Sequence, residues 1–153
     1  MIIPDLNDSD KELTSIAKFL VNISSDLVWH ISAFYPAYKM NHKSSTPHET
    51  LLRAYNIGRQ AGLRYVYTGN IPNEELESTY CPNCGTKVIE RWGIDLIENR
   101  LVGDKCQRCG YKIAGRFDWL INLCYYIKSN LKIYKEEKKK WKSFKSLFLF
   151  FYF

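Results

Sequence analysis

The sequence predicts an α/β protein followed by a small metal-binding β module, and three observations support this. Two Cys-x-x-Cys-Gly turns, residues 81–85 and 106–110, have the spacing of a tetrahedral four-thiolate site. Before these turns, apolar segments of strand length alternate with amphipathic helical patterns. After them, the chain becomes basic and aromatic. We therefore expect three regions, residues 1–70, 71–116 and 117–153.

Two helices are predicted in the first region. Ser9 and Glu12 have the spacing of a capping box, in which each side chain bonds to the other residue's amide. The apolar residues that follow have the periodicity of a one-faced helix: Leu13, Ile16, Ala17, Leu20 and Val21. A second helix is expected to begin with Thr46 as its cap and Pro47 in its first turn, and to stop at Gly62.

Strands are predicted around these helices. Residues 27–34 have the composition of a strand buried on both faces, so His30 is expected to be a hydrogen-bonded core residue. Residues 64–68 form the next strand, and residues 2–3 resemble the end of an earlier one, which would be an open edge. This alternation is typical of parallel strands in an α/β barrel. So small a piece buries too little surface to be stable alone, which indicates a part of something larger.

The second region is predicted to be a zinc-ribbon-like module. Its candidate ligands are the four cysteines of the two turns: Cys81, Cys84, Cys106 and Cys109. Four thiolates leave no open coordination position, so the site is expected to hold structure and not to activate water, with zinc or iron as the metal. Between the turns, residues 87–91 and 94–98 read as two strands joined at Gly93.

Basic residues flank the predicted ligands, and they allow two interpretations. These residues are Lys87, Lys105, Arg108 and Lys112. They would offset the negative charge of a four-thiolate centre, or they would contact phosphates. Nearby acidic residues nearly balance them, which favours the first interpretation and makes nucleic acid an unfavoured partner.

The last region carries most of the net charge. Residues 117–153 contribute +5 of the total +6 and hold 12 of the 23 aromatic residues. Either this region is an irregular or helical basic segment that lies on an anionic membrane or meets RNA, or it is a non-native extension, which we favour. The start of the chain has no secretory signal pattern, and no apolar run reaches the length of a membrane span, so a cytoplasmic location is expected.

Several motifs, in order, resemble one enzyme family. They are residues 2–10 (IIPDLNDSD), 29–40 (WHISAFYPAYKM), 46–51 (TPHETL), 61–70 (AGLRYVYTGN) and 80–85 (YCPNCG). Over about residues 1–116 the chain is similar to the C-terminal part of the radical SAM enzymes of the AmmeMemoRadiSam system, which are related to pyruvate formate-lyase activating enzyme. The resemblance implies a partial (β/α) barrel that binds a [4Fe-4S] cluster and S-adenosylmethionine. It also implies that Tyr35, where the family often has histidine, lies on the S-adenosylmethionine side. The alternative, which the residues support at least as well, is that Tyr35 is a loop aromatic residue that packs on its neighbours.

This chain departs from the family in one decisive respect. The family's cluster-binding C-x3-C-x2-C motif does not occur in the 153 residues. The resemblance therefore implies a C-terminal fragment that is inactive alone. The alternative is a non-enzymatic zinc-ribbon adaptor that binds nucleic acid or a protein through the ribbon and the basic tail. A further alternative is that the C-terminal fragment complements a separately encoded N-terminal half.

Overall fold

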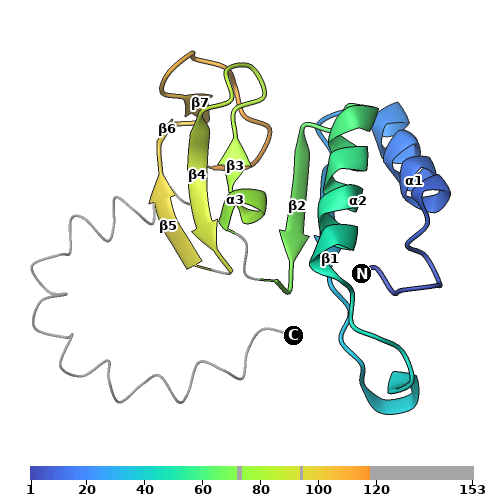
Figure 1. Ribbon diagram of the computed structural model, residues 1–153. Helices are drawn as coiled ribbons and strands as arrows, with labels where there is room; N and C mark the ends of the chain where they lie inside the picture. Colours follow the sequence, from blue (N-terminus) through green and yellow to red (C-terminus); the bar gives the residue numbers. More distant parts are fainter. Residues whose placement is uncertain (72–73, 94, 118–153) are drawn as a thin grey trace, which may run out of the picture. The chain divides into compact units, whose positions relative to one another are not determined.

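The computed structural model describes residues 1–71, 74–93 and 95–117 (Figure 1). The chain divides into two compact units, Met1–Ala114 and Gly115–Phe153. The predictions made for the basic tail, including its helical or irregular character, lie outside the described residues. Within the described ranges, no helix combines the length and the apolar character needed to cross a membrane.

The first half of the unit Met1–Ala114 alternates helices and parallel strands. Its elements are α1 (Asp10–Ile23), β1 (Val28–Ser32), a short 3₁₀ helix (Tyr38–Met40), α2 (His48–Ala61) and β2 (Tyr65–Gly69). Strands β1 and β2 pair in parallel, with Val28 opposite Tyr65 and Ser32 opposite Gly69. On the other side of β1, Ile2 forms a parallel bridge with Ala33. The predicted order of strand end, helix, strand, helix and strand is therefore present.

The termini of the two helices follow different rules. In α1, Ser9 is the N-cap, and its side chain accepts a hydrogen bond from the Glu12 amide. The Glu12 carboxylate accepts a hydrogen bond from the Ser9 hydroxyl at 2.6 Å. In the predicted capping box it would instead accept one from the Ser9 amide. Gly62 ends α2 as predicted, with the left-handed φ of 109° that glycine adopts without strain.

The prediction that Thr46 caps α2 is wrong. Pro47 is the N-cap residue, and no side chain caps this end of the helix. The Thr46 hydroxyl is instead inserted between two strands: it accepts a hydrogen bond from the Phe34 amide at 2.8 Å and donates one to the Ile2 carbonyl at 2.6 Å. It thereby bridges a donor and an acceptor that a direct strand bond would otherwise join.

The two helices cover one face of the sheet. The core between helices and sheet is formed by buried apolar side chains: Ile2, Leu13, Ala17, Ile31, Ala33, Leu51, Ala54, Leu63 and Val66. At Gly58 of α2 the helix approaches the sheet so closely that a Cβ atom would lie 2.9 Å from the Trp29 ring. Side chains alternate along a strand, so His30 and Tyr67 point to the opposite face.

The exposure of this opposite face contradicts two predictions, that β1 is buried on both faces and that His30 is a core residue. His30 is exposed, and Val28 is 48% exposed, so β1 is not buried on both faces. The His30 ring stacks against Tyr67, with 5.3 Å between ring centroids, and is not a core residue. The cause is tertiary: the helices cover one face only, and α3, the next element along the chain, contacts β2.

The second half of the unit is built from short antiparallel strands. Its elements are α3 (Glu74–Glu77), β3 (Thr79–Tyr80), β4 (Lys87–Trp92), β5 (Asp95–Asn99), β6 (Leu101–Val102) and β7 (Lys105–Cys106). One sheet has the strand order β3-β4-β5, and β6 pairs with β7. The two strands predicted between the cysteine turns are present as β4 and β5, separated by Gly93 in a left-handed conformation.

Polar contacts join this second half to β2. The Tyr67 hydroxyl lies 2.9 Å from Thr79 Oγ1, and the Arg91 guanidinium donates to the same Thr79 oxygen at 2.7 Å. The Arg91 guanidinium also lies over the Tyr67 ring, 5.6 Å from its centroid. The Ala114 amide donates to the Tyr65 hydroxyl at 3.1 Å. The two halves are therefore tied together by specific contacts on the face of β2 that the helices do not cover.

The first strand segment is not an open edge at residues 1–3. The Asn7 side chain accepts a hydrogen bond from the Ile3 amide at 2.7 Å and donates one to the Met1 carbonyl at 3.2 Å. These groups point away from β1, because the intervening Ile2 amide donates to Ser32 of β1. The Asn7 carboxamide thus occupies the place of a neighbouring peptide group and covers the edge that the sequence predicts to be open.

Candidate metal centre

The two cysteine turns have the same backbone construction. In the first, the Cys81 amide donates to the Thr86 carbonyl and the Gly85 amide donates to the Cys81 carbonyl. In the second, the Cys106 amide donates to the Tyr111 carbonyl and the Gly110 amide donates to the Cys106 carbonyl. Gly85 and Gly110 have φ values of 70° and 72°, which explains why a glycine follows each pair.

The structure brings the four predicted ligands together. Their Sγ atoms all lie within 4.8 Å of one another. Across the two turns, Cys81 Sγ lies 3.5 Å from Cys109 Sγ, and Cys84 Sγ lies 3.7 Å from Cys106 Sγ. A tetrahedron with zinc–sulfur bonds of about 2.3 Å has sulfur–sulfur edges of about 3.8 Å. The donor set and its spacing therefore fit a four-coordinate metal with no open position.

The thiols differ in their surroundings. Cys81 and Cys106 are buried, whereas Cys84 and Cys109 reach the surface. The Thr86 side chain, with its hydroxyl 3.3 Å from Cys84 Sγ, lowers the pKa of Cys84 to about 6, and a hydrogen bond from the Asn83 side chain lowers the pKa of Cys109. Burial raises the pKa of Cys81 to about 12. A bound cation deprotonates all its thiol ligands, so metal binding releases protons and weakens as the pH falls.

Two of the basic residues that flank the cysteine turns form ion pairs. Lys87 pairs with Glu90 at 3.4 Å, and Lys112 pairs with Asp104 at 3.2 Å. The Arg108 guanidinium donates to the Thr86 hydroxyl at 3.4 Å. Two of the four basic residues thus pair with carboxylates, and the offset of the thiolate charge stays a prediction.

Tyr35 lies just after β1, beside the carboxyl ends of the parallel strands. Its side chain is exposed, and its hydroxyl donates to the Asn70 carbonyl, just after β2, at 2.8 Å. The Asn70 side chain in turn donates to the Ala33 carbonyl at 3.2 Å. These bonds fix the loops at the edge of the sheet where α/β proteins place ligands. The four cysteines belong to other elements and do not contribute to this edge.

Two polar residues organise the same edge, Asn7 and Thr46, and the sequence predicted neither of these roles: Asn7 was not singled out, and Thr46 was expected to be a helix cap. Both lie within the quoted motifs, but their partners are backbone groups, and Thr46 reaches Ile2 across 44 positions of sequence. Three residues near this edge, Asp5, Tyr38 and Asn70, have positive φ values of 63°, 49° and 61°. The sequence Asp-Leu-Asn-Asp at residues 5–8 and the pair Gly-Asn at residues 69–70 are typical of turns, and they could have indicated the conformations of Asp5 and Asn70.

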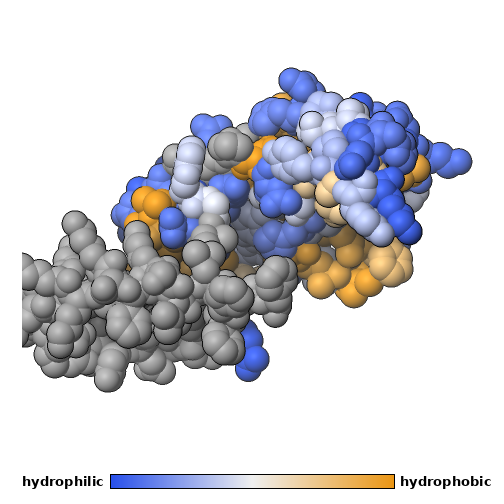
Figure 2. Space-filling view, turned by 90° about the horizontal axis from the view of Figure 1, so that it is seen from below, coloured by the Kyte–Doolittle hydropathy of each residue, from blue (hydrophilic) through white to orange (hydrophobic). Residues whose placement is uncertain are grey.

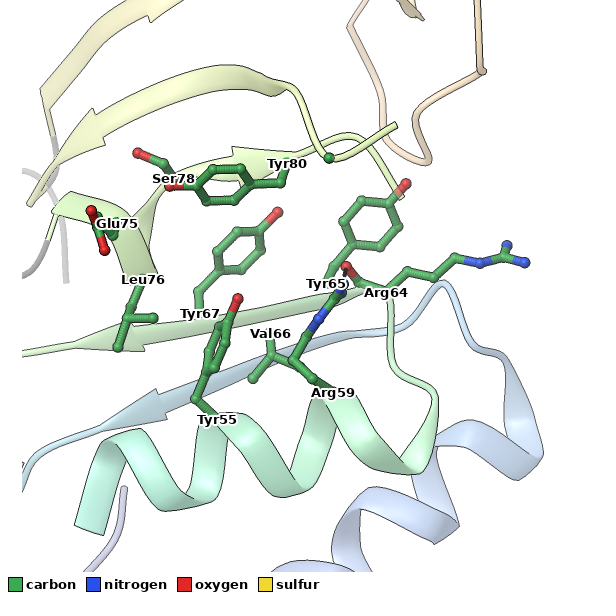
Figure 3. Close-up of a pocket in the computed structure, with 11 residues that line it drawn as sticks. Tyr55, Arg59, Arg64, Tyr65, Val66, Tyr67, Glu75, Leu76, Ser78 and Tyr80 are labelled. Atoms are coloured by element: carbon green, nitrogen blue, oxygen red, sulfur yellow. Dashed lines mark hydrogen bonds between the residues drawn. The ribbon is translucent and has the colours of Figure 1, made fainter. Parts of the chain in front are cut away.

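A tyrosine-lined cavity of about 330 Å³ lies between α2, β2 and the α3–β3 segment. In Figure 3, Tyr55 and Arg59 extend from α2, Tyr65 and Tyr67 from β2, and Tyr80 lies opposite. Protein groups already engage several of these side chains: Tyr65 and Tyr67 make the bonds described above, and Arg59 donates to the Leu63 carbonyl at 3.1 Å. We therefore interpret the cavity as a gap between packed elements.

The sequence is similar to that of a curated archaeal protein. In an alignment of 116 positions that covers 74% of this chain, the sequence is 40% identical to the uncharacterized protein MJ0808 of Methanocaldococcus jannaschii. The match covers 35% of that protein, so this chain spans about a third of the length of the curated relative it matches. No family model matches the chain, and no solved structure matches it.

Proposed function

We propose that the chain is the C-terminal part of a radical SAM-type enzyme, and that its four cysteines hold a structural zinc or iron ion. The observation that carries the metal assignment is the cluster of four Sγ atoms within 4.8 Å, built from two matching turns. Full thiolate ligation leaves no position for water or substrate, so the metal closes the fold and does not take part in chemistry.

The radical SAM assignment is supported by the resemblance of the motifs and by the β/α layout. Parallel strands with helices on one face are a unit of the barrel that the family implies. Tyr35 and Asn70 lie at the carboxyl edge, and we propose that Tyr35 contacts the S-adenosylmethionine side there. The part of the relative outside the match leaves room for the remainder of such an enzyme.

The residues present do not fit the reactive cluster itself. All four described cysteines belong to the metal centre, and the remaining Cys124 lies outside the described residues. A [4Fe-4S] cluster needs thiolates from another segment, such as a separately encoded N-terminal half. The isolated chain is therefore expected to be inactive in S-adenosylmethionine cleavage.

Metal analysis of the purified protein tests the metal assignment. We expect one zinc or iron ion per chain, and we expect Cys84→Ser and Cys109→Ser to lower this content strongly. Cys124→Ser is the matched control and should keep the metal. A wild-type protein without metal, or a Cys109→Ser variant that keeps a full metal complement, would contradict the proposal.

Anaerobic reconstitution with iron and sulfide tests the proposal that this chain alone does not bind the [4Fe-4S] cluster. We expect no visible absorbance of a [4Fe-4S] centre and no deoxyadenosine from S-adenosylmethionine. Formation of both by this chain alone would overturn the view that the cluster ligands come from elsewhere.

A further inference from the structure

The outer flank of α1 carries an apolar stripe. Its members lie at positions i, i+3 and i+7 of the helix, and each is exposed: Ile16 (41%), Phe19 (65%) and Ile23 (62%). Exposed apolar residues are ordinary when scattered, but this spacing places the three side chains along one line of the helix. Figure 2 shows one face of the molecule, on which apolar side chains form several patches among hydrophilic ones.

The stripe lies on the side of α1 that faces away from α2. Successive residues turn by about 100°, so the stripe falls about 60 to 120° to one side of Leu13. Ala17 and Val21 fall to the other side, where Val21 is the side chain nearest the Gly62 cap of α2. Ala17 is fully buried in the core. In Figure 1, α2 likewise lies between α1 and β2.

The order of the elements shows what kind of structure fits there. The helix α1 joins the first strand segment to β1, and α2 joins β1 to β2, so helices lie side by side on one face of the sheet. The stripe is on the flank where another helix would continue this layer. Its spacing is that of a ridge that packs into the groove of a neighbouring helix.

A second copy of this chain fits the stripe less well than a helix from a larger neighbour. A buried aromatic side chain accounts for about 150–250 Å², so three partly exposed side chains fall short of the roughly 800 Å² per partner of a stable interface. The neighbour must therefore be held by further contacts. Two thirds of the length of the M. jannaschii relative lies outside the match and can supply such a neighbour.

We propose that Ile16, Phe19 and Ile23 form the docking surface for an amphipathic helix of the polypeptide that corresponds to the unmatched part of that relative. This inference rests on the proposed function, because it names the surface by which the C-terminal part joins the rest of the enzyme. Asn7 already covers the neighbouring strand edge at residues 1–3, so the helix flank provides the specific contact.

A binding experiment with a defined probe tests this surface. The probe is the M. jannaschii relative expressed without the 116 residues that it shares with this chain. Mixed with the full-length chain, it should form a 1:1 complex in size-exclusion chromatography with light scattering. Phe19→Glu should raise the dissociation constant, measured by calorimetry, at least tenfold. Val102→Glu, at a 70% exposed apolar residue of β6, is the matched control and should bind like wild type.

Three results would overturn the proposal: no complex with the wild-type chain, an unchanged dissociation constant for Phe19→Glu, or a wild-type dimer that Phe19→Glu dissociates. The last result would assign the stripe to a second copy. Metal content and circular dichroism are measured on the same preparations. A loss of binding with full metal content then separates failure at this surface from failure of the metal centre.

Discussion

Thr46 joins the first strand segment to the end of β1. Its hydroxyl is buried and takes both roles of a hydrogen-bonding group, as acceptor from Phe34 and donor to Ile2. Its own amide also donates to the Phe34 carbonyl at 3.0 Å. One side chain therefore holds the end of the first strand segment, the end of β1 and the start of α2 in a fixed arrangement.

We predict that Thr46→Val destabilises the protein by about 2 to 4 kcal/mol. Valine keeps the shape but leaves a buried amide and a buried carbonyl without partners, at about 1 to 3 kcal/mol each. Urea denaturation followed by circular dichroism measures the loss. Thr46→Ser keeps the hydroxyl and should cost about 1 kcal/mol or less. Equal stability of the valine and serine variants would show that the bridge contributes nothing.

The residue scale also shows where sequence patterns stop being informative. Ser9 could be recognised as a helix cap because its partner is three residues away. Thr46 occupies a similar local pattern, yet its hydroxyl bonds to groups 12 and 44 residues away and does not cap α2. His30 fits a core strand by composition, but its exposure depends on which face of the sheet other elements cover.

At the scale of elements, the cysteine turns were predictable because their chemistry is local. A Cys-x-x-Cys-Gly sequence requires a tight turn with a left-handed glycine, and both turns adopt it. The strands β4 and β5 followed from the Gly93 turn and the apolar segments around it. The pairing of Lys87 with Glu90 and of Lys112 with Asp104 was not predictable, because several carboxylates lie close in sequence.

We predict that Gly85→Ala and Gly110→Ala weaken metal retention to a similar extent. No atom lies within 4 Å of a Cβ at either position, so the cost is the left-handed backbone alone, about 1 to 2 kcal/mol. Competition with a chelator measures the change in apparent affinity, expected to be about tenfold. Gly85→Asn and Gly110→Asn are the matched controls, since asparagine tolerates this conformation better. A large effect at one turn only would contradict their equivalence.

At the scale of the whole unit Met1–Ala114, the metal centre and the β/α half are expected to be energetically coupled. The contacts of Tyr67 with Thr79 and Arg91, and of Tyr65 with Ala114, join the strands of the metal module to β2. A metal that binds only the folded chain stabilises every element that folds together with its ligands. The centre would then support the helices and parallel strands, although no cysteine lies in them.

We predict that removing the metal lowers the stability of the β/α half as well as that of the metal module. Trp29 reports on the first and Trp92 on the second, so each can be followed in a variant whose other three tryptophans are replaced by phenylalanine. With excess chelator, the thermal transitions seen by Trp29 and Trp92 should both fall by more than about 5 °C and stay coincident. Tyr67→Phe, which removes the hydroxyl contact to Thr79, should begin to separate them. If the chelator shifts the Trp92 transition alone in the otherwise intact protein, the two halves fold independently and the metal does not support the β/α half.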